Sequence, residues 1–227
     1  MNVLVVAAHP DDEVLGCGGA ISKHSQQGDI VNILILAEGA TSRAMHRDPD
    51  QWQAELSNLG NAADQVRQQL GAKTVHLHDF PDNRMDSCDL LDIVKVIESA
   101  IHQFQPAVVY THHSGDVNID HRCIHEAVIV ACRPQPCHPV KTLLFFEIPS
   151  STEWQPPGSA PAFSPNWFVD ISNTLSAKID ALSVYQSEMR SWPHPRSVEA
   201  VKHLAHWRGA TVGVSAAEAF IVGRILV

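Results

Sequence analysis

Short apolar runs recur along the chain and predict a series of buried strands. Val3–Ala8 and Ile30–Ala37 are continuous and rich in β-branched residues, which is typical of strands covered on both faces of a sheet. Four shorter runs have a similar character and are also predicted as strands: Thr74–Leu77, Ala107–Thr111, Lys141–Ile148 and Trp167–Ile171.

Helical stretches separate many of these runs. Gln51–Leu70 has apolar residues at helical spacing and stops at Gly71, a residue that commonly ends helices. Other helices are predicted from the glycines at 16, 18 and 19 to Gln27 and over Leu90–Phe104, Arg122–Cys132, Leu175–Met189 and Ser197–Trp207. Alternation of strands and helices favours a Rossmann-like α/β fold, with a mostly parallel sheet and helices on both faces. We expect one domain over residues 1–227, in which the Pro- and Ser-rich stretch 149–165 is a long surface loop.

Composition and charge narrow the class of protein. The 227 residues include 44% hydrophobic residues, which is enough for one sizeable core. The formal net charge is −9 and no Lys/Arg-rich run occurs, so no nucleic-acid partner is expected. The apolar runs are strand-sized and the N-terminus lacks a secretory pattern, so we expect no integral membrane segment and a cytoplasmic location. Five scattered cysteines without a CxxC pair fit a reduced protein.

Ionisable residues gather where three predicted strands end. The segments 9–13, 38–43 and 112–121 each follow the carboxyl end of such a strand. In open α/β sheets, ligands bind outside the carboxyl ends of the strands. The chemistry of the protein is therefore expected at this edge of the sheet.

Residues 9–13 offer one imidazole and three carboxylates within one turn. Adjacent carboxylates repel one another, and a bound cation relieves the repulsion. The mixed nitrogen and oxygen donors suit zinc or another borderline divalent metal. The alternative is a solvated acidic turn in which an aspartate is the helix N-cap. Glu13 is expected to cap the helix instead of taking part in catalysis.

Residues 112–121 supply the donors that such a metal site still needs. The segment contains three histidines and two aspartates. A catalytic zinc commonly takes three protein ligands and leaves one coordination position open. His9, one aspartate and one histidine from this segment would complete that set.

Together, the two segments resemble the signature of the PIG-L/LmbE-type deacetylases. The matching runs are Ala8-His9-Pro10-Asp11-Asp12-Glu13, with the glycines that follow, and Asn118-Ile119-Asp120-His121. The resemblance implies that His9, Asp12 and His121 bind one zinc ion per chain, with iron(II) as the alternative metal. It also implies that Asp11 is the general base, and that Asp120 orients the metal-binding histidine or a catalytic partner.

One position departs from the pattern of this family. Many members have a histidine three positions before the metal-binding histidine, thought to stabilise the oxyanion, and this chain has Asn118 there. An amide still donates a hydrogen bond but carries no positive charge. Asn118 and His113 are therefore the predicted catalytic donors. His112 is predicted to contact substrate and is a further candidate for the oxyanion.

Three other residues are predicted to contact substrate. Phe80-Pro81-Asp82-Asn83-Arg84 resembles a family loop near the substrate that uses a carboxylate, so Asp82 is expected to bind a sugar hydroxyl. Arg43 and Arg84 lie on strand-end loops and suit hydroxyl or anionic groups. Surface salt bridges for the arginines, and a turn role for Asp82, are the alternatives.

The resemblance predicts a hydrolase that removes an N-acyl group from an amino sugar or a glycoconjugate that contains one. The expected acyl group is acetyl. By analogy with the family, a homo-oligomer is expected, either a trimer or a hexamer. A Rossmann-type dinucleotide-binding protein is disfavoured because three carboxylates would repel the pyrophosphate. A metal-free hydrolase lacks the GxSxG signature and would have to use a nucleophile such as Cys17. A non-catalytic sugar- or metal-binding protein is the last alternative.

Overall fold

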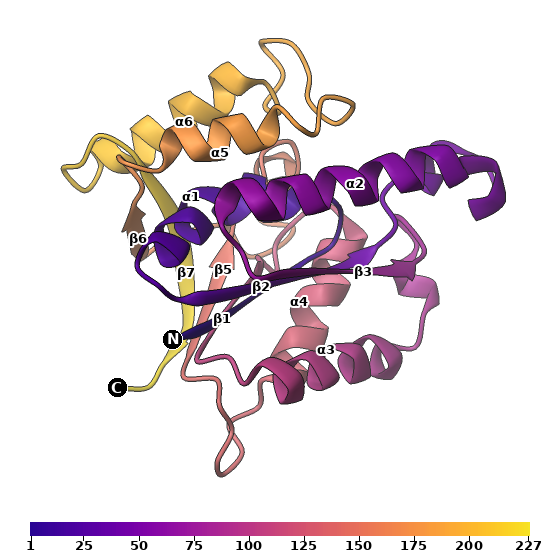
Figure 1. Cartoon of the computed structure of the whole chain (residues 1–227), viewed down its shortest axis with the longest axis horizontal. Helices are drawn as coiled ribbons and strands as arrows, with labels where there is room; N and C mark the ends of the chain where they lie inside the picture. Colours follow the sequence, from indigo (N-terminus) through magenta and orange to yellow (C-terminus); the bar gives the residue numbers. More distant parts are fainter.

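Seven strands form one sheet in the order β3-β2-β1-β4-β5-β7-β6, in a computed structural model that describes residues 1–227 (Figure 1). The strands are β1 (Asn2–Ala7), β2 (Ile30–Ala37), β3 (Thr74–Phe80), β4 (Val108–His112), β5 (Thr142–Phe146), β6 (Trp167–Asp170) and β7 (Ala217–Ile225). Strands β1 to β5 pair in parallel, whereas β7 runs antiparallel to both β5 and β6. The predicted mostly parallel α/β sheet is confirmed.

Helices cover both faces of this sheet (Figure 1). They are α1 (Asp12–Gln26), α2 (Gln53–Leu70), α3 (Leu90–Phe104), α4 (Ile119–Ala131), α5 (Leu175–Leu182) and α6 (Val198–Ala210), with short 3-10 turns η1 (Thr41–Arg43), η2 (Pro49–Trp52), η3 (Met85–Ser87) and η4 (Thr152–Trp154). None of these helices is both long enough and apolar enough to cross a bilayer.

The apolar character of β1 follows from its place between two cores. Val3 and Val5 belong to the core formed with α1, α2 and α5, whereas Leu4 and Val6 belong to the core formed with α3 and α4. Successive side chains of a strand point to opposite faces, so a strand buried on both faces is apolar at every position.

Three elements differ from the sequence prediction. Helix α1 begins at Asp12, so the glycines at 16, 18 and 19 lie inside it instead of before it. No strand is predicted after Trp207, yet β7 joins β5 to the edge strand β6. Its first residues, Ala-Glu-Ala, have low strand propensity, but the Phe-Ile-Val that follows is typical of a strand, so the prediction missed a local signal. Helix α5 ends at Leu182 instead of Met189, and the turns that follow place the hydroxyl of Tyr185 2.7 Å from Glu13.

The Pro-rich stretch 149–165 has no strand and only one 3-10 turn, η4. It begins buried at Ser151 and Thr152 and becomes exposed further on. The stretch packs tightly against the end of β4, because a Cβ atom added at Gly115 would lie 1.9 Å from the carbonyl oxygen of Pro161. Only glycine tolerates such a close approach of two backbone segments.

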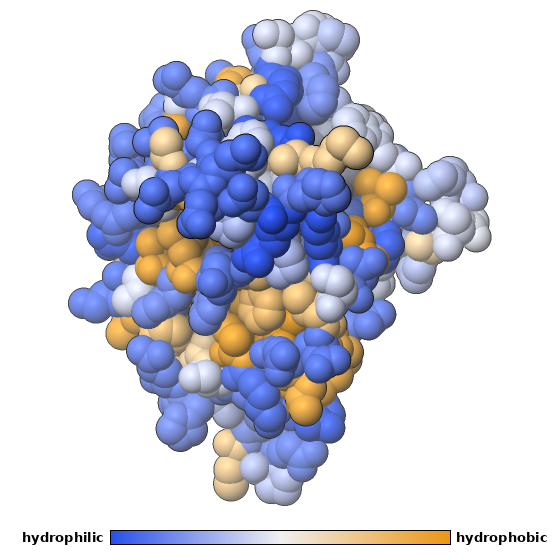
Figure 2. All heavy atoms as spheres, turned by 90° about the vertical axis from the view of Figure 1, so that its right-hand side faces the viewer, coloured by the Kyte–Doolittle hydropathy of each residue, from blue (hydrophilic) through white to orange (hydrophobic).

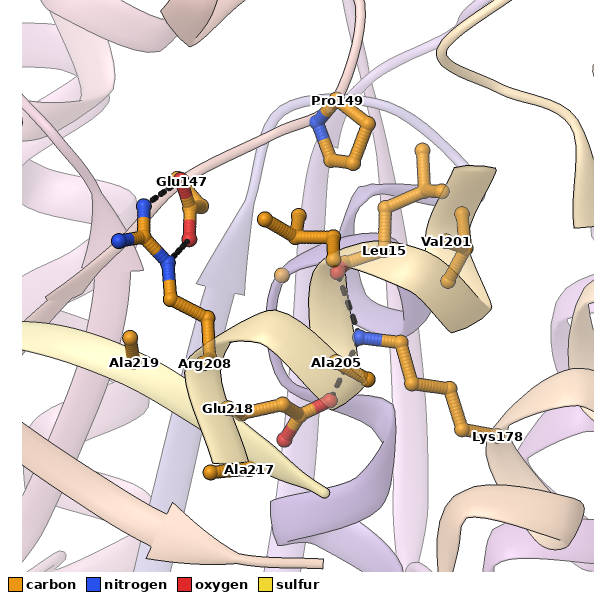
Figure 3. A pocket seen from close by; sticks show the side chains of 12 residues that line it. Leu15, Glu147, Pro149, Lys178, Val201, Ala205, Arg208, Ala217, Glu218 and Ala219 are labelled. Carbon is orange, nitrogen blue, oxygen red and sulfur yellow. Dashed lines mark hydrogen bonds and ion pairs between the residues drawn. The ribbon is translucent and has the colours of Figure 1, made fainter. Parts of the chain in front are cut away.

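A buried ion pair spans a break in α1. The backbone of Cys17 is not helical (φ −150°), so the carbonyl of Leu15 and the N–H of Gly19 lose the bond they would share in an unbroken helix. Lys178 donates to that carbonyl (2.8 Å), and Glu218 accepts from that N–H (2.9 Å). Figure 3 shows Lys178 between Leu15 and Glu218, with Nζ 2.6 Å from the carboxylate. The pair therefore ties α5 and β7 to the helix that starts at Asp12.

We expect Glu218→Gln to lower the free energy of unfolding by about 3 kcal/mol or more, because it leaves the charge of Lys178 buried without its partner. Urea unfolding followed by circular dichroism measures this change. The double variant Lys178→Met/Glu218→Gln should recover part of the loss, since the unpaired charge is gone. Glu199→Gln, on the exposed side of α6, is the matched control. A loss below about 1 kcal/mol in Glu218→Gln would contradict this structural role.

Candidate active site

The carboxyl ends of β1 and β4 bring the predicted metal ligands together. Nδ1 of His9 and Nε2 of His121 lie 3.1 Å and 3.2 Å from Oδ2 of Asp12. One ligand atom from each of the three residues lies within 4.8 Å of the other two. His9 and His121 are far apart in the sequence, and the parallel pairing of β1 with β4 brings them close together in space. The face onto which these strands end is turned toward the viewer in Figure 2, and hydrophilic side chains gather around its middle.

Two buried atoms of this group have no hydrogen-bond partner. They are Oδ1 of Asp12 and Nε2 of His121, whose approach to Asp12 is close but lacks hydrogen-bond geometry. Buried polar atoms in folded proteins nearly always have a partner, so both atoms fit coordination to a cation. Two imidazoles and one carboxylate form a donor set that suits both zinc and iron(II).

The electrostatics of the group lead to the same conclusion. Burial lowers the pKa of His121, but Asp12 and Asp116 outweigh burial and raise it to about 9. Burial also lowers the pKa of His9, yet hydrogen bonds to three carboxylates, Asp12 first, raise it above its usual value. The surrounding carboxylates therefore stabilise positive charge at both imidazole rings. A divalent cation supplies such charge while it binds the neutral imidazole.

Each of these two histidines also has a carboxylate at its second ring nitrogen. Nε2 of His9 lies 3.0 Å from Oδ2 of Asp120, and Nδ1 of His121 lies 3.1 Å from Oδ2 of Asp116. Such carboxylates fix the tautomer and the ring orientation of metal-binding histidines. The sequence predicts Asp120 beside His121. In the structure, Asp120 contacts His9 instead, and the carboxylate that contacts His121 is that of Asp116.

Both of these carboxylates are held in turn by neighbouring segments. Asp120 accepts from the backbone N–H groups of Asn83 (2.6 Å) and Met85 (3.0 Å). Asp116 accepts from the hydroxyl groups of Ser151 and Thr152, at 2.7 Å for Thr152. Burial would raise the pKa of Asp116, but His121 and these hydrogen bonds keep it below its usual value. The η4 segment and the loop after β3 thus support the two histidine rings.

Asp11 lies next to Asp12 in sequence but faces a different environment. Its Oδ2 lies 2.9 Å from Nη1 of Arg196, and its Oδ1 is buried without a partner. Its φ of 121° is a strained value for a residue other than glycine, and Oε2 of Glu13 accepts its N–H at 3.0 Å. Burial raises the pKa of Asp11, and the guanidinium of Arg196 opposes that rise. One carboxylate of the turn therefore faces the histidines, and the other keeps one oxygen free.

Glu13 braces this turn instead of capping the helix with its side chain. Tyr185 donates a hydrogen bond to Oε1 of Glu13 (2.7 Å), while Oε2 accepts from Asp11. Burial raises the pKa of Glu13 to about 7. The carboxyl group holds the backbone of the turn in its strained conformation.

The predicted oxyanion donors Asn118 and His113 both have structural partners. Oδ1 of Asn118 caps α4 by accepting from Asp120 (2.8 Å) and His121 (3.4 Å), and its Nδ2 donates to Asn83. Nε2 of His113 lies 2.9 Å from the carbonyl oxygen of Pro161. These contacts do not favour a catalytic role for either residue.

His112 lies beneath the three predicted metal ligands His9, Asp12 and His121, here called the metal group, and does not reach the surface. Its ring stacks on His121 at a centroid distance of 3.9 Å, and its Nε2 accepts the N–H of Ala8 at 2.8 Å. The side chain is completely buried. This placement does not support the predicted contact with substrate, because the ring of His121 covers that of His112.

The predicted substrate residues hold the loops around the site. Nη2 of Arg43 lies 2.6 Å from Oε1 of Glu188, and Arg84 donates to the carbonyl groups of Ala44 and Met45. The contact of Arg43 corresponds to the salt-bridge alternative, whereas Arg84 anchors a loop through backbone carbonyl groups, a role that the sequence analysis did not predict.

Asp82 is buried and forms a second group of potential ligands with His9 and Asp120. Its Oδ1 lies 3.3 Å from Nε2 of His9, and its Oδ2 accepts the N–H of Ser42 at 3.1 Å. Burial would raise the pKa of Asp82, but His9 and Ser42 lower it to about 2. This group shares His9 with the first group, and both of its carboxylates lie beside Nε2 of that ring.

The sequence analysis did not identify Arg196 or Tyr185 as site residues. Both lie more than 170 positions after the motif they contact. Neither belongs to a recognisable motif, so no local signal marks them. Asp116, Ser151 and Thr152 are near recognised segments, but their contacts with the site depend on how two loops meet.

Comparison with known proteins adds a family assignment to this geometry. The family described as "PIG-L: GlcNAc-PI de-N-acetylase" matches residues 4–132, which include all three residues of the metal group. A crystal structure of the conserved protein TT1542 from Thermus thermophilus has a TM-score of 0.76 and 25% sequence identity. That match covers 99% of this chain and 96% of the other.

Curated relatives extend the comparison. The uncharacterized deacetylase YaiS of Escherichia coli K12 is 28% identical over 194 residues, covering 82% of this chain and 91% of the relative. The diacetylchitobiose deacetylase of Thermococcus kodakarensis is 27% identical over 194 residues, covering 82% and 70%. The 4-oxalmesaconate hydratase of Pseudomonas putida, named for a different reaction, is 24% identical over 208 residues, covering 85% and 76%.

Proposed function

The chain belongs to the PIG-L family. We propose that it is a metal-dependent hydrolase that removes an N-acyl group from an amino sugar or a glycoconjugate containing one, and that this acyl group is acetyl. The observation that carries the proposal is the convergence of His9, Asp12 and His121, two of which have buried ligand atoms without hydrogen-bond partners. The relatives named as deacetylases of N-acetylated sugars support the substrate class.

Zinc is the proposed metal, at one ion per chain, and iron(II) is the alternative for the same donor set. His9, Asp12 and His121 would hold it. When bound, a zinc ion polarises the amide carbonyl and lowers the pKa of water toward about 7.

Asp11 is the proposed general base. Its free Oδ1 accepts a proton from the attacking water while the water oxygen bonds to the carbonyl carbon. The same carboxyl group then returns the proton to the nitrogen as the C–N bond breaks. The products are the free amine and the carboxylic acid, acetic acid when the acyl group is acetyl, so the atoms and protons balance without a further reactant.

The proposal also includes a cytoplasmic location and a homo-oligomeric state, either a trimer or a hexamer. Exposed aromatic side chains at Trp154 and Trp167, on and next to the Pro-rich stretch, are suited to subunit contacts. Analytical ultracentrifugation of the purified protein measures the assembly.

The experiment that tests the function combines metal analysis with acetate release. We expect about one zinc ion per chain and acetate release from N-acetylglucosamine or diacetylchitobiose. Chelation should abolish that release and added zinc should restore it, because the proposed chemistry needs the ion that His9, Asp12 and His121 hold. Activity that survives complete metal removal would contradict the proposal. Bound metal without acetate release from any N-acetylated sugar would contradict the deacetylase assignment and favour another reaction, such as that of the hydratase relative.

A further inference from the structure

The segment before α6 carries an arginine into the active site. Nη1 of Arg196 lies 2.9 Å from Oδ2 of Asp11, although the two residues are 185 positions apart. The side chain of Arg196 is mostly buried, at 22% exposure, and that of Asp11 is almost completely buried. No motif predicts this contact, and no role for Arg196 follows from the metal group.

Arg196 is itself held from several sides. Its Nε donates to Oγ of Ser150 at 2.8 Å, and its backbone N–H donates to Nδ1 of His194 at 3.0 Å. Its carbonyl accepts the N–H of Arg190 at 3.2 Å. The ring of His194 packs edge-on against Trp154, at 5.7 Å between centroids. The guanidinium therefore meets Asp11 in a preorganised position, which reduces the entropy lost in forming the contact.

Asp11 depends on such a partner. Its backbone is strained, and among the residues around it only Arg196 contacts its side-chain oxygens by a hydrogen bond. With Oδ2 held, Oδ1 is the oxygen left for a proton. Without Arg196, the carboxylate could rotate and present either oxygen, or turn away from the site.

We propose that Arg196 is a positioning residue that fixes the carboxylate of Asp11, so that one defined oxygen accepts the proton of the attacking water. This inference rests on the proposed function. A displacement of about 1 Å in a reacting group can cost about 100-fold in rate, which sets the expected size of the effect.

We expect Arg196→Gln to lower kcat for acetate release by about 100-fold, with KM changed by less than about 3-fold and with metal content unchanged. Arg190→Gln is the matched control, because Arg190 lies on the same segment and its side chain contacts only the carbonyl groups of Ser187 and Met189. Its kinetics should equal those of the unaltered protein. A kcat for Arg196→Gln within about 3-fold of that control would overturn the proposal.

Two further measurements separate positioning from a merely structural contact. Guanidinium ion, at concentrations below those that unfold the protein, should partly restore kcat of Arg196→Ala but not of Arg190→Ala. In an Asp11→Asn background, Arg196→Gln should have almost no additional effect on kcat, since the carboxylate it holds is gone. Absence of rescue together with additive losses in the double variant would overturn the positioning role.

A crystal structure of Arg196→Gln tests the inference even if no N-acetylated sugar is a substrate. A rotated or disordered Asp11 side chain, with the metal ligands in place, is the expected result. An Asp11 carboxylate that keeps its orientation would overturn the inference without bearing on the deacetylase proposal. Failure of the unaltered protein to release acetate would contradict the deacetylase proposal, whereas the crystal structure would still test the contact between Arg196 and Asp11.

Discussion

Asp11→Asn is expected to lower kcat for acetate release by about 1,000-fold while the protein keeps its metal. The substitution removes the proposed proton acceptor, and general-base catalysis typically contributes about 100-fold to 10,000-fold. Asparagine has nearly the same size and tolerates positive φ better than most residues, so the turn at φ 121° should persist. The proposed metal ligands Asp12 and His9 are not altered. Steady-state kinetics and metal analysis on the same preparation measure both quantities.

The matched control for this change is Asp180→Asn, because Asp180 is exposed on α5, away from the metal group. It should leave kcat, KM and metal content unchanged. Urea unfolding of both variants shows whether a loss of activity reflects a loss of fold. An Asp11→Asn protein with full activity would show that Asp11 is not the base. The role would then pass to another group near the metal.

His121→Ala is expected to abolish both metal binding and activity. His121 is one of three proposed ligands, and its loss leaves only one imidazole and one carboxylate, which is too few for a tight catalytic zinc site. The variant also removes the ring that stacks on His112 and pairs with Asp116, so stability should fall as well. Metal analysis after dialysis and the acetate assay measure the two losses.

Because instability alone would also release the metal, His121→Gln provides a second test. It keeps most of the side-chain volume and a polar end group, so the fold should survive while metal affinity is lost. His102→Ala, on an exposed position of α3, is the control and should retain metal and activity. Stoichiometric metal in a folded His121→Gln protein would show that His121 is not a ligand. The metal group would then have to be reassigned.

Much of the fold could be predicted because its signals are local. The continuous apolar runs of β1 and β2 predict strands buried on both faces, and the helical spacing of Gln51–Leu70 predicts a helix that the structure has at Gln53–Leu70 as α2. Such patterns depend only on neighbouring residues. Strand β7 was not predicted although its Phe-Ile-Val run is typical of a strand, whereas the burial of Glu218 against Lys178 and the N–H groups of Gly19 and Ala20 has no local signal. Partners of this kind appear only when the chain has folded.

The active site also has features that the sequence predicts and features that depend on tertiary contacts. Sequence alone predicted the proposed metal ligands, because His9 and Asp12 share one turn and the resemblance to the family singles out His121 in a second motif, and the structure brings the three side chains together. It also located them at the carboxyl edge of a parallel sheet, since the order of strands and helices implies that topology. Both inferences rest on residues close together in sequence.

Only the tertiary structure decided how these residues are oriented. It placed Asp120 against His9 instead of His121, and it brought Arg196 across 185 positions to Asp11. In the structure, the side-chain oxygen of Asn118 caps α4 by accepting backbone N–H groups and is therefore not free. The physical reason is that hydrogen bonds and ion pairs form over about 3 Å. Which groups come that close depends on how whole elements pack, and no short stretch of sequence contains that information.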